Sequence, residues 1–151
     1  STINVDTLLI TLYETYEPVC MKQNLELKLH LSEESYPAML TDKDRLFQIL
    51  CVFMDNAIQH SKNNSLIEIE VIATEKNIAF SVADHGQGIS DEDKQYIFDR
   101  FYSGDKSHTN KSNFGLGLSI AKELTQMLNG TITINDTAGG GATFTVKFPL
   151  K

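Results

Sequence analysis

The sequence is poor in cysteine, has no long apolar run and carries few positive charges. Its two cysteines, Cys20 and Cys51, lie in apolar periodic segments, and it contains no CxxC pair and no cluster of histidine and cysteine. Such cysteines are typical of small buried side chains in a reducing compartment, which argues against a disulfide framework and a cysteine-based metal site. No stretch approaches the ~20 apolar residues that span a bilayer, and no signal peptide is visible.

The charge balance is acidic: 20 Asp and Glu residues against 13 Lys and Arg give a formal net charge of −7. A nucleic-acid surface requires clustered Lys and Arg, so we expect no nucleic-acid partner. The overall field would repel an anionic ligand, whose site would need a metal ion, a helix N-terminus or a few aimed cations. No internal repeat or second domain is visible, so we expect residues 1–151 to form a single compact domain.

The alternation of apolar and polar residues predicts an α+β fold. Helical spacing indicates helices over Asp6–Lys22, Asp44–Ser61, Asp91–Phe98 and Gly115–Leu128. Strands are indicated over Leu25–Leu31, Ala38–Thr41, Leu66–Thr74, Asn77–Ala83, Thr131–Asn135 and Ala142–Phe148, with Thr2–Val5 as a short strand or lead-in. Pro18 is expected to bend or end the first helix. This order suggests a two-layer sandwich with one mixed, largely antiparallel sheet and the helices on one face.

The segment Asp44–Ser61 combines a buried helix with polar residues at its C-terminal end. Its apolar stripe comprises Leu46, Ile49, Leu50, Phe53, Ala57 and Ile58. Asp42 or Asp44 can cap its start. Asp55 and Asn56 interrupt the apolar run. Either Asp55 is solvent-exposed and Asn56 makes a hydrogen bond at the helix edge, or the amide oxygen of Asn56 binds Mg²⁺, which takes oxygen ligands and completes its shell with waters and phosphates.

Two glycine-containing segments follow that can serve a nucleotide. Asp84–Ile89 comes directly after a strand, where a carboxylate can accept a hydrogen bond from an exocyclic amine such as that of adenine. The alternative is a plain turn. Asn113–Ile120 leads a glycine loop into a helix, whose free N–H groups would face a phosphate. Close helix packing explains this segment equally well. Together with Asn56, these features describe an ATP·Mg²⁺ site.

The motifs in this order resemble those of the ATP-binding (catalytic) domain of bacterial sensor histidine kinases, whose fold is shared with DNA gyrase and a heat-shock chaperone. The resemblance covers essentially the whole chain. Asp44–Ser61 resembles the N box, Asp84–Ile89 the first glycine box, Ile97–Tyr102 the F box, Asn113–Ile120 the second glycine box and Gly139–Phe144 a GxGTxF-like segment. It implies a Bergerat fold: a two-layer α/β sandwich with three helices on one face and an ATP lid over Asp99–Phe114.

The resemblance also implies the ligand contacts. Asn56 would chelate Mg²⁺, Asp84 would hold the adenine, and Arg100, Phe101 and Lys106 would lie on or beside the lid. The residues expected to contact ATP are Asn56, Gln59, His60, Asp84, Gly86, Gly88, Ile89, Tyr102, Lys106, Gly115, Leu116, Gly117, Leu118 and Thr143. His60 would pack on the adenine or act as a cation at the helix C-terminus.

The sequence departs from the family pattern at four positions. Val52 stands where the kinases usually have a second Asn and the ATPases a catalytic Glu. Gln59, Ser103 and His108 stand where basic residues are common, so the site has fewer fixed positive charges. The aromatic residues Phe98, Phe101 and Tyr102 either dock a partner helix or plug the core under the lid; we expect Phe98 to be core and Tyr102 more exposed.

The implied function is that of a two-component sensor kinase fragment. In the family, the γ-phosphoryl group moves to a histidine on a separate helical dimerisation domain, and from there the phosphorelay reaches a response regulator. None of the four histidines lies in the expected acceptor context. We expect a monomeric cytoplasmic fragment of a membrane-bound homodimeric parent. The alternatives are a self-contained ATPase of the same fold and a degenerate nucleotide-binding or interaction domain.

Overall fold

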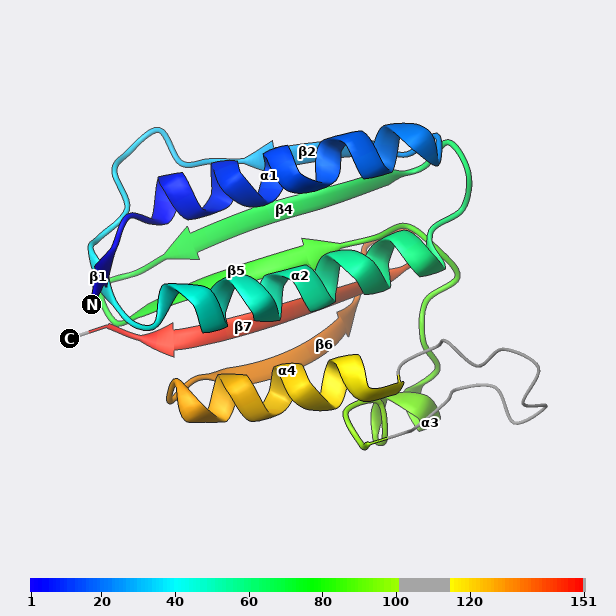
Figure 1. Ribbon diagram of the computed structural model, residues 1–151. Helices are drawn as coiled ribbons and strands as arrows, with labels where there is room; N and C mark the ends of the chain where they lie inside the picture. Colours follow the sequence, from blue (N-terminus) through cyan, green and yellow to red (C-terminus); the bar gives the residue numbers. More distant parts are fainter. Residues whose placement is uncertain (101–114, 151) are drawn as a thin grey trace.

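The computed structural model describes residues 1–100 and 115–150, which form two layers (Figure 1). The helices are α1 (Val5–Lys22), α2 (Lys43–His60), α3 (Asp91–Lys94) and α4 (Gly115–Met127). The strands are β1 (Thr2–Ile3), β2 (Glu26–His30), β3 (Met39–Leu40), β4 (Leu66–Ala73), β5 (Asn77–Ala83), β6 (Thr131–Asp136) and β7 (Ala142–Pro149). The predicted helices and strands are all present, and the predicted lid lies largely outside the described residues.

The main sheet has five strands in the order β2-β4-β5-β7-β6. Strands β2 and β4 run parallel because their connection crosses through α2, and every other neighbouring pair is antiparallel. Strands β1 and β3 form a separate antiparallel pair. The predicted hairpin is β4–β5, with Glu68 opposite Ala83. The mixed, largely antiparallel sheet is therefore confirmed.

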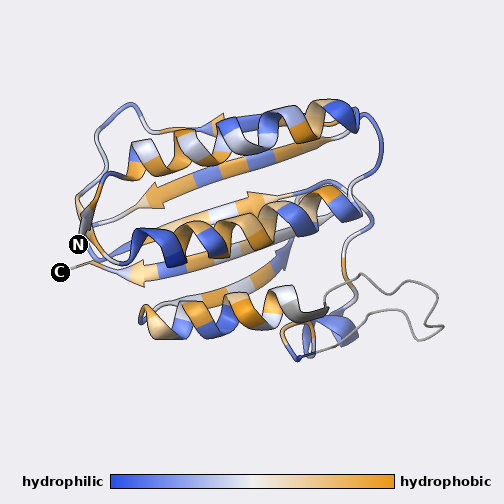
Figure 2. Ribbon diagram, in the orientation of Figure 1, coloured by the Kyte–Doolittle hydropathy of each residue, from blue (hydrophilic) through white to orange (hydrophobic). Residues whose placement is uncertain are grey.

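Helices α1, α2 and α4 lie side by side over one face of this sheet, as predicted (Figure 1). Apolar residues alternate along the strands and recur at helical spacing along α2 (Figure 2), so one face of each strand and one stripe of the helix are buried. Phe53 of α2 stacks on Phe144 of β7 with ring centroids 5.4 Å apart. Among the described residues, no helix is both long and apolar enough to cross a membrane.

The first helix ends at Lys22 as its predicted range has it, whereas the third is shorter than predicted. Pro18 does not end α1, which continues to Lys22, because the proline lies on the exposed side while Tyr16 and Cys20 keep the helix packed on the core. Helix α3 ends at Lys94 instead of Phe98. The chain then turns, which buries Ile97 completely and sets Phe98 edge-on to Phe144, 6.2 Å away. Phe98 thus packs against the core, as expected.

Candidate functional site

The Asp84 carboxylate is held rigidly at the end of β5. The residue is 4% exposed, and its Oδ1 accepts hydrogen bonds from the backbone N–H groups of Gly86 at 2.9 Å and Ala142 at 3.2 Å. Burial raises the pKa of this carboxyl, and the two N–H donors oppose that rise. Within the described residues, no hydrogen bond reaches Oδ2. One carboxylate oxygen is therefore committed to the fold, and the other is available to a ligand.

Two glycines let the Asp84 loop approach its neighbours closely. A Cβ on Gly86 would lie 2.1 Å from the backbone oxygen of His60, the last residue of α2. A Cβ on Gly141 would lie 2.1 Å from the backbone oxygen of Asp84, and Gly141 has a φ of +118°. The loop is thus pressed between the C-terminal end of α2 and the turn before β7.

Asn56 presents an unpaired acceptor in the last turns of α2. The residue is 7% exposed, and its Oδ1 is buried without a hydrogen-bond partner in the described part of the chain. An unpaired buried carbonyl costs ~1–3 kcal/mol, so such an atom is characteristic of a ligand site. In the described part of the chain, Oδ1 therefore makes no hydrogen bond at the helix edge of the kind that the alternative interpretation requires. The neighbouring Asp55 is exposed, as that interpretation expects, and accepts a hydrogen bond from the Tyr16 hydroxyl at 2.8 Å.

The first turn of α4 meets the same end of α2. Gly115 and Leu116 open the helix, Leu118 is fully buried, and a Cβ on Gly117 would lie 3.6 Å from Cγ1 of Val52. Val52 stands one helical turn before Asn56. The first backbone N–H groups of a helix such as α4 have no partner within the helix itself. The ends of α2 and β5 and the start of α4 lie together at one end of the molecule (Figure 1).

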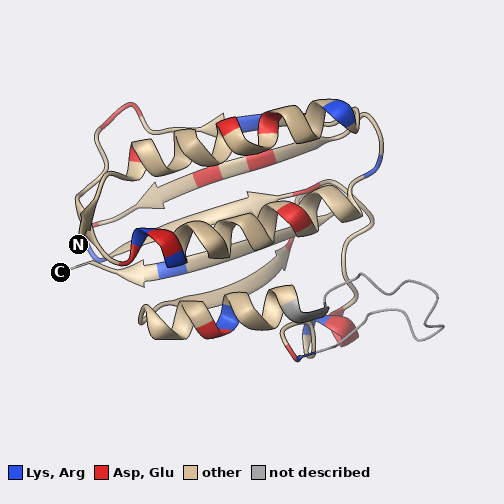
Figure 3. Ribbon diagram, in the orientation of Figure 1, with Lys and Arg blue, Asp and Glu red and all other residues tan. Residues whose placement is uncertain are grey.

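Helix α2 brings no Lys or Arg side chain to this end. Helix α2 carries Lys and Arg only in its first turn, at the opposite end (Figure 3). In the parts of the chain that the structure describes, no group of three or more His, Cys, Asp or Glu side chains could hold a metal ion. Asn56 therefore fits a divalent ion only in the way that suits Mg²⁺, with the remaining ligands supplied by water and an anionic ligand.

Most of the other predicted residues lie near the end of α2 and the Asp84 loop or outside the described residues. Gln59 is exposed in the last turn of α2, His60 is half-buried beside the Asp84 loop, and Ile89 packs against the core. Gly88 follows in the same loop with a φ of +79°. Tyr102 and Lys106, like Phe101, Ser103 and His108, lie outside the described residues.

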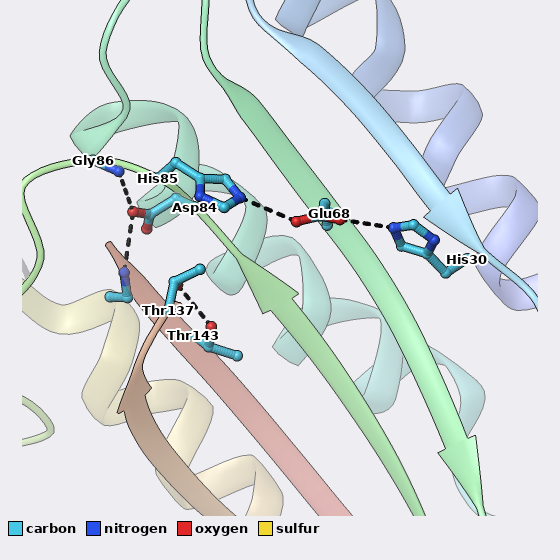
Figure 4. Close-up of polar contacts among 8 residues, drawn as sticks. His30, Glu68, Asp84, His85, Gly86, Thr137 and Thr143 are labelled. Carbon is cyan, nitrogen blue, oxygen red and sulfur yellow. Dashed lines mark hydrogen bonds and ion pairs between the residues drawn. The ribbon is translucent and has the colours of Figure 1, made fainter. Parts of the chain in front are cut away.

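Thr143 is not brought to this group. Strand alternation turns its neighbour Phe144 toward α2 and Thr143 toward the opposite face of the sheet. There its hydroxyl pairs with that of Thr137 at 2.8 Å (Figure 4). The adjacent residue Ala142 instead reaches Asp84 through its backbone. This contact depends on the antiparallel register that sets Ala83 opposite Thr143, which no local sequence signal specifies.

A family model described as "Histidine kinase-, DNA gyrase B-, and HSP90-like ATPase" matches residues 41–151. The chain belongs to this family. The matched segment of this ATPase family includes α2, the Asp84 loop and α4, which are the elements that bring Asn56, Asp84 and Gly117 together. The resemblance to the ATP-binding domain of histidine kinases is therefore confirmed.

Named members of the family agree with this assignment. The sensor protein CiaH of Streptococcus pneumoniae is 36% identical over 142 residues, which cover 93% of this chain and 32% of CiaH. The catalytic domain of the histidine kinase ThkA has 25% identity and a TM-score of 0.84, covering 99% of this chain and 95% of that one. Full-length ShkA in complex with AMPPNP has 26% identity and a TM-score of 0.83, covering 97% of this chain and 30% of that one. The chain thus spans about a third of the curated relative's length.

Proposed function

We propose that this domain binds ATP with Mg²⁺ and presents the γ-phosphoryl group to a histidine on a separate helical dimerisation domain of a sensor histidine kinase. The observation that carries the proposal is the unpaired, buried Oδ1 of Asn56. It lies in the same end of α2 that contacts the Asp84 loop and the start of α4. An oxygen ligand, a directed carboxylate and a helix N-terminus together match a nucleotide with its metal.

Asp84 would recognise the base. Its Oδ1 is occupied by two backbone donors, so Oδ2 would accept the hydrogen bond from the adenine amino group. Gly86 and Gly88 let the loop backbone pack closely against the end of α2 and against Gly141, which would hold the Asp84 carboxylate in place for the base. A base with an oxygen at the same position would place an acceptor against an acceptor, so the domain would prefer adenine.

Asn56 and the start of α4 would serve the phosphates. The bound ion would neutralise the charge of the phosphates. Helix α2 cannot do so, because its Lys and Arg side chains lie in its first turn, far from Asn56. The backbone N–H groups at Gly115–Leu118 would donate to the phosphate oxygens, with the helix dipole favouring the negative charge.

The proposal assigns phosphoryl transfer to the complete kinase and not to this domain alone. Val52 packs near Gly117 at the position where the ATPases of the family carry a glutamate, so α2 offers no carboxylate there to activate water. The acceptor histidine would come from the dimerisation domain of the parent, and a response regulator would receive the group next. We propose a membrane-anchored homodimeric parent with this domain in the cytoplasm, since the similar protein CiaH is named a sensor.

Titration with a non-hydrolysable ATP analogue, with and without Mg²⁺, tests the proposal. For the unmutated domain, we expect the calorimeter to detect binding that Mg²⁺ strengthens. Asn56→Ala should weaken binding when Mg²⁺ is present and change little in its absence, because the amide oxygen acts through the ion. Asn63→Ala, an exposed asparagine just beyond α2, is the matched control and should bind like the parent. The absence of heat at millimolar nucleotide would instead indicate an interaction domain with a degenerate site.

A further inference from the structure

Two histidines share one carboxylate on the sheet face away from the helices. Glu68 of β4 contacts His85 through Oε1, 3.0 Å from Nε2, and His30 of β2 through Oε2, 2.9 Å from Nε2 (Figure 4). The hydrogen bond from His85 is the largest of the influences that lower the pKa of Glu68. Because an ionised carboxylate only accepts hydrogen bonds, both Nε2 atoms carry a proton in this arrangement.

This network reaches the candidate site through one peptide unit. Strand alternation continues past the end of β5, so Asp84 is buried toward the helices while His85 points to the opposite face. On the helix side, the loop backbone is held by the bonds of Asp84 to Gly86 and Ala142. On the far side, the His85–Glu68 bond is the matching attachment. The loop that directs the Asp84 carboxylate is thus fastened on both faces of the sheet.

We propose that Glu68 is a positioning residue for the nucleotide: by holding His85 it fixes the direction of the Asp84 carboxylate. This inference rests on the proposed ATP site and adds a residue to it. Glu68 itself lies on the face opposite Asn56 and touches no ligand. His30 holds the second oxygen of Glu68 and so limits the rotation of the carboxylate.

The His85–Glu68 bond has a carboxylate as its acceptor. A hydrogen bond to an ionised carboxylate is stronger than one between two neutral groups, so its loss should loosen the Asp84 loop. A charged His85 also favours the ionised form of Asp84 on the other side of the loop.

Other charged groups face the same network. On β2, Lys28 is the register partner of Glu68, so its positive charge lies near this carboxylate. On β4, Glu70 stands opposite His30. On α2, His60 lies beside the loop and also acts on Asp84. These contributions cancel when each variant is compared with the unmutated domain at the same pH, as long as the substitution does not change them.

The test compares Glu68→Gln with Glu70→Gln. Both variants remove one negative charge from the same face of β4, but only Glu68 contacts His85. We expect Glu68→Gln to weaken ADP binding about fivefold, and Glu70→Gln to remain within about twofold of the unmutated domain. In a His85→Gln background, Glu68→Gln should cause no further loss, because its effect passes through His85.

Amide exchange at Gly86 without nucleotide gives a second readout. Its N–H bonds to Asp84, so Glu68→Gln and His85→Gln should each lower its protection while the thermal midpoint stays near that of the parent. Unchanged exchange and unchanged affinity in Glu68→Gln would overturn the inference, as would a loss in Glu68→Gln that persists in full in the His85→Gln background. If the parent itself binds no ADP, the proposed function fails, and the exchange at Gly86 still decides whether Glu68 positions the loop. If Glu68→Gln does not fold, the amide exchange of Gly86 in His85→Gln decides whether the His85–Glu68 contact positions the loop.

Discussion

Replacement of Asp84 by asparagine tests the base contact with the smallest change of shape. In the structure, Oδ1 accepts hydrogen bonds from two backbone N–H groups, at 2.9 and 3.2 Å. An asparagine must place its only side-chain oxygen at this position, because its NH₂ group would face two donors there. The NH₂ group then occupies the Oδ2 position and faces the adenine amino group, donor against donor.

The expected loss follows from this exchange of atoms. A hydrogen bond to a charged group contributes ~1.5–3 kcal/mol, and its removal corresponds to about a tenfold to hundredfold loss of affinity. The fold should not weaken. Burial raises the pKa of Asp84, so above that pKa the ionised carboxylate opposes folding, and its penalty disappears only as the pH falls through the raised pKa. The neutral asparagine side chain carries no such penalty, so near neutral pH the Asp84→Asn variant should unfold at the same temperature as the parent or higher.

The assay is calorimetric titration of both proteins with ATP and with ITP, in the presence of Mg²⁺. ITP carries an oxygen where ATP carries the amino group, so it is a control for base recognition within the same protein. We expect the ratio of ATP affinity to ITP affinity to fall in Asp84→Asn, while contacts to the phosphates stay the same. Equal ATP affinity in the two proteins, with the fold intact, would refute the assignment of Asp84 to the base.

Three further changes test the packing around the site. Gly86→Ala should abolish nucleotide binding and destabilise the fold by ~1–3 kcal/mol, since its Cβ would lie 2.1 Å from the backbone oxygen at the end of α2. In Gly117→Ala, the added Cβ would make an ordinary 3.6 Å contact, so the urea midpoint of this control variant should stay nearly unchanged. Tyr16→Phe should lower the free energy of unfolding by ~1 kcal/mol through loss of the hydrogen bond to Asp55, and a urea titration with an unchanged midpoint would contradict this. Phe53→Ala should cost ~3–5 kcal/mol because this fully buried ring leaves a cavity, which thermal unfolding would detect.

Local patterns specified most of the elements. The apolar stripe of α2 and the alternation in β4 and β5 predicted these elements correctly, because a side-chain period of 3.6 or 2 is a property of a short segment. Of the two candidate caps for α2, Asp42 is the one that accepts a hydrogen bond, from the N–H of Arg45 at 3.2 Å. The order of the motifs also predicted the family correctly, since it depends on sequence alone.

Helix boundaries required the tertiary structure. Pro18 predicts a break because it lacks an N–H, but the burial of Tyr16 and Cys20 against the core holds α1 together around it. The pattern after Asp91 predicts a helix that continues to Phe98, but α3 ends at Lys94. The chain turns there, and Ile97 becomes fully buried in the core. Packing energy outweighed local preference in both cases.

The surroundings of the candidate site also depended on tertiary contacts. The sequence by itself identified Asp84 and Asn56 as polar residues beside apolar segments. It could not reveal that Ala142 donates to Asp84, that Thr143 points to the far face, or that Glu68 holds His85. Each of these contacts joins residues from different strands. Which residues meet across strands depends on register, and register is defined only when the strands pair in the complete sheet.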